Sequence, residues 1–262
     1  GFLAGFLGRV FPKGADTAGW LRRFEHWWDL NPFAESSPER GWVVKSLADG
    51  SVAGFLGLIP ACYAVDGKPT PAVVPTTWVV DPGHREAALM LGRRLKHLEG
   101  RTLIVSTTGR RDFQGRLVKR GWVPHTEAVR QFVPCGRVSR WLLGGGNPLS
   151  PGRRLTSEVA DVLSVLPASQ EGRGIEKWLT PEYLWWYRNS PAREHRFAGV
   201  VDEAGRLSSF LMLAPSPVAC FLNVWAVVDW FTAELGNEEL RGLLASVAAR
   251  PESAGLCGPG KS

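Results

Sequence analysis

The sequence contains little cysteine, and its cysteines follow no metal-binding or disulfide pattern. The four are scattered without a CxxC pair: Cys62, Cys135, Cys220 and Cys257. This spacing offers no zinc site and no evident disulfide framework, so we expect a reducing, cytoplasmic compartment. The sequence also lacks a Walker loop, a Ser-His-Asp order and metal-ligand spacing. It therefore predicts no P-loop nucleotidase, no serine hydrolase and no metal site.

Long apolar runs are absent as well. A membrane-spanning helix needs about 20 consecutive apolar residues, and the nearest stretch, residues 216–231, is interrupted by Asn223 and Asp229. We therefore expect no transmembrane segment. The opening GFLAGFLGRVF has no basic leading region, which argues against a signal peptide. The first residue is not Met, and we expect residues upstream to be missing or removed.

The composition is that of a globular protein. The 262 residues suffice for one large domain or two of ordinary size. Hydrophobic residues make up 44% and charged residues 21% of the chain, proportions typical of soluble proteins. The 12 tryptophans indicate either a core with large flat side chains or an apolar ligand groove.

The net charge of +6 is concentrated in one part of the chain. Residues 93–154 contain 14 Lys or Arg against three acids, a local excess of 11 positive charges. This distribution suits a phosphate-rich partner, such as a cofactor, a carrier protein or a nucleic acid, or else a solvated basic surface. Few aromatic residues are interleaved with these arginines, which disfavours single-stranded nucleic acid as the partner.

Residues 75–100, PTTWVVDPGHREAALMLGRRLKHLEG, predict a strand, a tight turn and a helix. β-branched and aromatic residues at 76–80 indicate a mostly buried strand, which the Asp-Pro-Gly turn at 81–83 ends. From Arg85 onward, apolar residues fall on one helical face: Ala88, Leu91, Leu95 and Leu98. Amides at the start of this helix would favour an anionic group such as a pyrophosphate, although the pattern also fits a purely structural connection.

The flanking sequence predicts further elements of both kinds. We expect a helix over residues 17–31, a hairpin around Asp49-Gly50 and a second turn at Asp66-Gly67. That second turn would join short strands at 63–65 and 70–74. A strand over residues 102–108 and a short helix ending at Gly121 follow, and the best linker is GGGNP at residues 144–148.

The residues after this linker repeat the pattern before it. The echoed pairs are WWDLNP at 27–32 with WWYRNSP at 185–191, GSVAGFLGLIP at 50–60 with GRLSSFLMLAP at 205–215, and WVVD at 78–81 with WAVVD at 225–229. The match of WVVD with WAVVD predicts that Asp81 and Asp229 end equivalent strands. Each of the two would then cap the following turn. Three matches in the same order predict an internal duplication with the period of a whole domain. The second copy stops where a counterpart of the 102–108 strand would begin.

The order of these elements resembles that of the GNAT (GCN5-related) N-acyltransferase superfamily, over residues 20–125 and more weakly over 175–250. Val80-x-Pro82-x-His84-Arg85 resembles the entry to that family's pyrophosphate loop, and KRGW at 119–122 resembles its closing K-x-G-F. The family's loop, R/Q-x-x-G-x-G/A, corresponds here to REAALM at 85–90, in which Ala and Met replace the glycines. Each added Cβ restricts how closely a phosphate can approach the backbone. A Tyr that many members use as an acid corresponds to Leu117.

The resemblance implies transfer of an acyl group from acyl-CoA, or from an acyl-carrier protein thioester, to an amine. The implied donor-binding residues are Val80, Arg85, Glu86, Ala87, Ala88, Leu89, Met90 and Arg110, with Arg93, Arg94, Arg111 and Arg116 near the donor's phosphates. The backbone of Val79 or Val80 would contact the thioester oxygen. Candidate acids or bases are Tyr63, His84 and Ser106. Each also has a structural interpretation, as a packed aromatic, a solvated turn residue and a strand hydroxyl.

We therefore expect an α+β fold, with a mixed sheet flanked by helices, in two GNAT-like halves in tandem. The predicted division is a GNAT-like acyltransferase domain at residues 1–143, a linker at 144–154 and a degenerate or truncated second half at 155–262. The leading hypothesis is an N-acyltransferase acting on the amine of a small metabolite, sugar or lipid precursor, without a metal. The alternative is a GNAT-like protein that binds a ligand or partner without catalysis.

Overall fold

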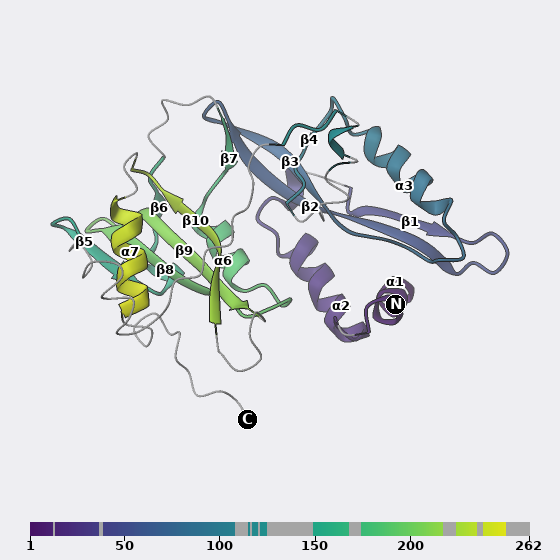
Figure 1. Ribbon diagram of the computed structural model, residues 1–262, viewed down its shortest axis with the longest axis horizontal. Helices are drawn as coiled ribbons and strands as arrows, with labels where there is room; N and C mark the ends of the chain where they lie inside the picture. The colour runs from purple at the N-terminus through teal and green to yellow at the C-terminus, as the bar shows by residue number, and fades with distance from the viewer. Residues whose placement is uncertain are drawn as a thin grey trace. The chain divides into compact units, whose positions relative to one another are not determined.

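The structure is a computed structural model that describes residues 1–12, 14–36, 39–107, 115, 117–119, 121–124, 149–167, 174–216, 224–234 and 238–249. The chain forms two compact units: Gly1–Glu127 with Arg173–Trp178, and Ala128–Gly172 with Leu179–Ser262. Each unit contains one mixed sheet with helices packed on it (Figure 1). The predicted α+β fold class is confirmed. The GGGNP linker, residues 144–148, lies outside the described residues, and the predicted domain limits stay a prediction.

The sheet of the first unit has the order β1-β2-β3-β4, antiparallel except for the parallel β3–β4 pair. Its strands are β1 (Gly41–Lys45), β2 (Val52–Val65), β3 (Lys68–Val80) and β4 (Leu103–Ile104), and β7 (Ile175–Lys177) pairs with the end of β2. The turn at Asp66-Gly67 is confirmed, with φ values of +49° and +76° that suit a tight hairpin.

Two prolines lie inside these long strands. Pro60 pairs with Val73 inside β2, and Pro75 pairs with Leu58 inside β3. Among the described residues, each proline has a strand neighbour on one side only, because β1, β7 and β4 pair with other parts of β2 and β3. A proline is tolerated where its missing N–H leaves no ladder bond unmade. The predicted short strands therefore merge into two long ones.

Helices cover both faces of this sheet (Figure 1). On one face, α1 (Phe2–Val10), α2 (Thr17–Phe24) and a π-helical turn (Glu25–Asp29) pack against Phe55 and Val79. Trp28 in that turn donates its indole N–H to the carbonyl oxygen of Leu58 at 2.8 Å. On the opposite face, α3 (Ala87–Lys96) packs against Leu56 and Leu58. The predicted helix over residues 17–31 is thus confirmed, although it changes to π-helical hydrogen bonding at Glu25.

The second unit has the sheet order β10-β9-β8-β5, with β6 parallel to β9. Its strands are β5 (Arg153–Thr156), β6 (Ser164–Val165), β8 (Arg196–Asp202), β9 (Arg206–Ser216) and β10 (Val224–Thr232). Helix α6 (Pro181–Arg188) and a 3-10 turn (Val159–Asp161) pack on one face. Helix α7 (Glu238–Ala249) packs on the other, against Leu211 and Leu213.

The two sheets share one register, and this register corrects one of the predicted matches. The matching segments 50–60 and 205–215 are 155 residues apart in the sequence. Two corresponding hydrogen bonds have acceptor residues, Ala53 and Ser208, with the same separation. The amide of Asp81 donates to Ala53 O at 2.8 Å, and the amide of Ala233 donates to Ser208 O at 2.7 Å. Ala233 is therefore the counterpart of Asp81. Asp229 lies inside β10, so the prediction that it ends an equivalent strand is wrong. The letter match of WVVD with WAVVD therefore does not follow the register of the two sheets.

Candidate functional site

Strands β3 and β4 run parallel and separate early. They pair only at Ala72–Leu103 and Val73–Ile104, followed by one bond from the Val105 amide to Val73 O at 3.0 Å. β3 then continues to Val80 with β2 on one side and, among the described residues, no strand on the other. Residues 74–80 therefore present backbone donors and acceptors along an open edge. This is where the sequence placed the thioester contact.

The open edge carries a bulge. Thr77 and Trp78 together stand opposite the single residue Leu56 of β2. Thr77 has a φ of +50°, a conformation that costs a β-branched residue about 1–3 kcal/mol and that concentrates at functional sites. Bulges of this kind bend a strand and redirect its backbone groups. The strand is thus distorted within three residues of its end.

The geometry distinguishes between Val79 and Val80 as the backbone donor. The amide of Asp81 points at β2, because it donates to Ala53 O. Successive amides of an extended strand point to opposite sides. The Val80 amide therefore faces the open edge, and the Val79 amide faces β2.

The loop at 85–90 offers fewer free amides than the sequence suggested. The amides of Ala87, Ala88 and Leu89 donate to the carbonyls three residues earlier, at 3.0–3.2 Å, and that of Met90 donates to Glu86 O at 3.3 Å. Within the described hydrogen bonds, the amides of Arg85 and Glu86 alone have no acceptor in this segment. An anion at this helix end would therefore be held by two amides and the exposed Arg85 side chain.

A glycine allows α3 to lie close to β2. A Cβ on Gly54 would lie 3.3 Å from Val80 Cγ2, 3.4 Å from Ala87 Cβ and 3.4 Å from Leu91 Cδ1. Ala87 is buried here, while Leu89 and Met90 are exposed. Ala87 is thus a packing residue, and a close approach of the helix to the strand end depends on small side chains at this contact.

The three acid or base candidates lie at different places. His84 lies in the turn after β3, with Nδ1 3.7 Å from Asp81 Oδ1 and, in the described part of the chain, no hydrogen-bond partner. Ser106 is exposed just beyond the point where β3 and β4 separate. Tyr63 is buried near the opposite end of β2, and its nine-residue separation from Gly54 corresponds to roughly 30 Å of strand. The structure therefore brings His84 to the Val80 end and leaves Tyr63 away from it.

The predicted basic residues are distributed along α3 rather than gathered at its start. Arg93 and Arg94 are exposed in the last turn, and Arg93 lies about 9 Å along the axis from the first helical residue. Their charge suits the negative end of the helix dipole. Arg110, Arg111 and Arg116 lie outside the described residues. Asp81 accepts from the Gly83 amide at 2.9 Å, which confirms its predicted role in capping the turn.

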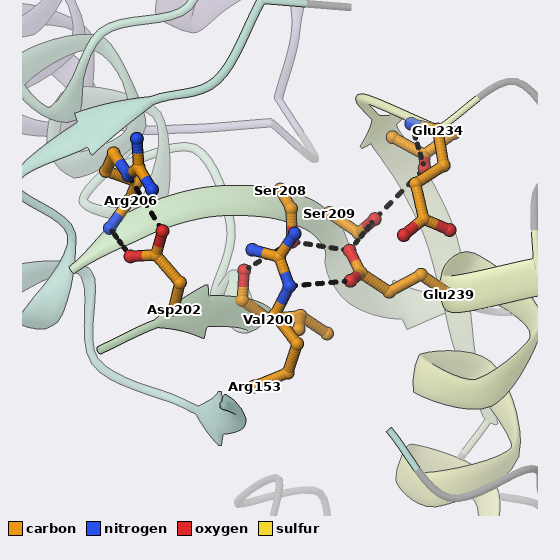
Figure 2. Close-up of polar contacts among 9 residues, drawn as sticks. Arg153, Val200, Asp202, Arg206, Ser208, Ser209, Glu234 and Glu239 are labelled. Atoms are coloured by element: carbon orange, nitrogen blue, oxygen red, sulfur yellow. Dashed lines mark hydrogen bonds and ion pairs between the residues drawn. The ribbon is translucent and has the colours of Figure 1, made fainter. Parts of the chain in front are cut away.

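The corresponding helix end of the second unit is occupied by the protein's own carboxylate (Figure 2). Glu239, in the first turn of α7, is buried, and its Oε1 accepts from Ser208 Oγ at 2.5 Å and from Ser209 Oγ at 2.7 Å. Its Oε2 lies 3.5 Å from Arg153 Nε. Ser209 Oγ also lies 3.0 Å from Thr232 Oγ1, whose hydroxyl can donate to it while Ser209 donates to Glu239. A buried negative charge in the first turn of α7 disfavours an external anion beside it.

Sequence reasoning missed both features that distinguish the two strand–helix junctions. The positive φ of Thr77 leaves no trace in the residue type, since Thr is usual in strands. The second feature had a signal: where the first copy has Ala53-Gly54, the second has Ser208-Ser209. Hydroxyls at two adjacent positions of an otherwise apolar strand require a polar partner, and Glu239 supplies it.

The described residues contain no helix long and apolar enough to cross a membrane. No cluster of three or more His, Cys, Asp or Glu within those same ranges forms a candidate metal site.

No family model and no curated protein matches the sequence. Among solved structures, N-myristoyltransferase of Saccharomyces cerevisiae with bound myristoyl-CoA and inhibitors is 10% identical, over 89% of this chain and 63% of that chain, with a TM-score of 0.46. A GCN5-related N-acetyltransferase from Anabaena variabilis is 12% identical, over 82% and 54%, with a TM-score of 0.45. A probable N-acyltransferase from Enterococcus faecalis is 12% identical, over 76% and 50%, with a TM-score of 0.41. The chain thus spans less than two thirds of each of these structures. At this similarity these structures assign no substrate and no residue role.

Proposed function

We propose that this chain is an N-acyltransferase that moves an acyl group from acyl-CoA, or from an acyl-carrier protein, to the amine of a small metabolite, sugar or lipid precursor in the cytoplasm. The observation that carries this proposal is the open, bulged edge of β3, which leads directly into the turn and helix α3. A thioester lying along this edge would meet the Val80 amide. The phosphates of its carrier would lie at the start of α3, so the first unit would hold the donor.

The chemistry would follow from these positions. A neutral amine attacks the thioester carbonyl, and negative charge develops on its oxygen; a fixed amide donor at that oxygen lowers the barrier. The N–H of Val80 would be that donor. The imidazole of His84, whose Nδ1 faces Asp81, would take the proton of the amine directly or through a water molecule. Leu117 has no proton to give, so water would protonate the leaving thiolate.

Charge reversal at Arg85 tests the donor site. Arg85→Glu removes the one cation at the start of α3 and adds a second negative charge beside Glu86. We expect acetyl-CoA, or a longer acyl-CoA, to bind at least tenfold more weakly by isothermal titration. The matched control is Arg93→Glu, which makes the same charge change on an exposed residue in the last turn of the same helix. Equal losses in the two variants would indicate a general charge effect and contradict this placement.

Proline substitution tests the oxyanion donor. Val80→Pro deletes an N–H that faces the open edge, so the sheet should form while turnover falls by about 100-fold and donor affinity stays within about threefold. Val79→Pro deletes an N–H that faces β2 and should instead lower the melting temperature. Unchanged turnover in a folded Val80→Pro protein would exclude this amide as the donor.

One set of observations favours the alternative, a GNAT-like protein that binds a ligand or partner without catalysis. Four amides of the 85–90 loop are already used within the turn, Glu86 places a negative charge beside the anion site, and Leu117 cannot act as an acid. Titration with acetyl-CoA and a series of longer acyl-CoAs separates the two functions. Binding of none of them would remove the acyltransferase and leave the non-catalytic protein.

A further inference from the structure

The second unit contains a polar pocket that lies apart from its occupied helix end. Its volume is about 640 Å³, within the range of small-molecule sites. The pocket lies where the last turn of α6, the following loop and the start of β8 meet. Its titratable lining residues are Glu158, Arg188, Arg193, Glu194, His195 and Arg196.

Positive charge exceeds negative charge in this lining. Arg188 Nη1 lies 3.5 Å from Glu158 Oε2, and Arg196 Nε lies 3.0 Å from Glu194 Oε1, but both carboxylates are 58% exposed. Exposed ion pairs of this kind are weak, so an incoming anion can compete with them. Arg193 forms no ion pair with any described residue, and its guanidinium charge is left unneutralised.

Two buried nitrogen atoms at the pocket have no hydrogen-bond partner in the described part of the chain: Nη1 of Arg196 and Nδ1 of His195. Arg196 stacks on Trp225, with its guanidinium carbon 4.2 Å from the ring centroid, and His195 is 9% exposed against Tyr187, with ring centroids 5.1 Å apart. Leaving a buried polar group unpaired is unfavourable. A ligand that bonds these atoms would recover that free energy.

The protonation state of His195 suits it to contact a ligand as a neutral side chain beside the arginines. Burial, and next the nearby charge of Arg193, lower the pKa of His195 to about 4. Its imidazole is therefore neutral at pH 7 and offers one donor and one acceptor. The positive charge available to a ligand comes from the guanidiniums, which suit planar carboxylates and phosphates alike.

We propose that this pocket binds a small ligand through an oxyanion, a carboxylate or a phosphate group, held by Arg193 and Arg196 with His195 beside it. The site belongs to the second unit and does not depend on the proposed transfer reaction.

The test is a titration of the full chain, followed through the imidazole NMR signals of His195, with inorganic phosphate in one series and succinate in another. Saturable shifts at millimolar concentration are expected with at least one of the two, and the stronger binder identifies the oxyanion. Arg193→Gln should weaken that binding at least fivefold. The matched control, Arg241→Gln, removes the same charge from an exposed residue of α7 in the same unit and should leave the affinity unchanged.

Two results would overturn the proposal: no saturable shift with either anion, or equal weakening in the two variants. Acyl-CoA affinity measured on Arg193→Gln keeps the two sites separate. It should equal that of the unmodified chain, whether or not the pocket binds an anion.

Discussion

Replacing Glu239 by Gln is the most direct test of the difference between the two strand–helix junctions. The substitution keeps the shape of the side chain and removes its charge. The amide oxygen can still accept from Ser208 and Ser209. The amide nitrogen, however, would stand where Oε2 now faces Arg153 Nε at 3.5 Å, so that two donors meet in a buried place.

The magnitude follows from the contacts that change. Hydrogen bonds to a charged group contribute about 1.5–3 kcal/mol each, against about 1 kcal/mol for neutral ones. Two such bonds become neutral and one ion pair is lost, so Glu239→Gln should lower the free energy of unfolding of the second unit by about 2–3 kcal/mol. Glu239→Ala removes both acceptors and leaves Arg153 without its counterion, for which we expect about 3–5 kcal/mol.

The control is one residue away. Glu238→Gln makes the same charge change at the same helix end, but Glu238 is exposed, so the loss should stay within the dipole contribution of about 0.3–1 kcal/mol. Urea unfolding gives the free energies, and hydrogen exchange of residues 196–216 assigns the loss to β8 and β9. Equal losses for the two variants, or faster exchange in β1–β3 alone, would refute the role given to Glu239.

Three further predictions concern stability. Trp28→Phe deletes the bond to Leu58 O and should cost about 1–2 kcal/mol in urea unfolding; no loss would mean that this bond contributes nothing. Thr77→Gly relieves a positive φ and should be neutral or stabilising by up to about 1 kcal/mol, whereas Thr76→Gly should cost about 0.5–1 kcal/mol, and thermal unfolding will show whether the signs differ. Because the pKa of His195 is lowered to about 4 from 6.5, the unfolded chain takes up its proton first as the pH falls. The free energy of unfolding should therefore decrease between about pH 6.5 and 4, and His195→Gln should flatten that slope.

Local sequence patterns predicted the elements whose conformation depends mainly on residues within the element itself. Asp66-Gly67 specifies a hairpin turn by its tolerance of positive φ, and Leu91 and Leu95 specify the buried face of α3 by their spacing. The lengths of β2 and β3 were not predicted, because the effect of Pro60 and Pro75 depends on whether the strand has a neighbour on that side. This is a property of the sheet and is not encoded next to the proline.

The candidate site was predicted in position and not in detail. The strand–turn–helix at residues 75–100 is present, and the sequence placed its backbone donor at Val79 or Val80. Choosing between the two required the direction of the Asp81 amide, which follows from strand pairing alone. The number of free amides in the loop could not be predicted either, because it depends on whether the first turn of α3 closes its own hydrogen bonds.

The two units differ in the side chains at the junction between the long strand and the following helix, and this difference bears on the proposed function. In each, a helix begins just past a long strand and packs on the neighbouring strand. In the first unit the contact is Gly54 against Ala87, two positions without polar side-chain atoms, and the charged side chains beside it, Arg85 and Glu86, are exposed. In the second unit the carboxylate of Glu239 is buried against the hydroxyls of Ser208 and Ser209. Because a buried, hydrogen-bonded carboxylate repels a second anion, the proposed donor site is expected at the first junction, where β3 leaves its edge unpaired among the described residues.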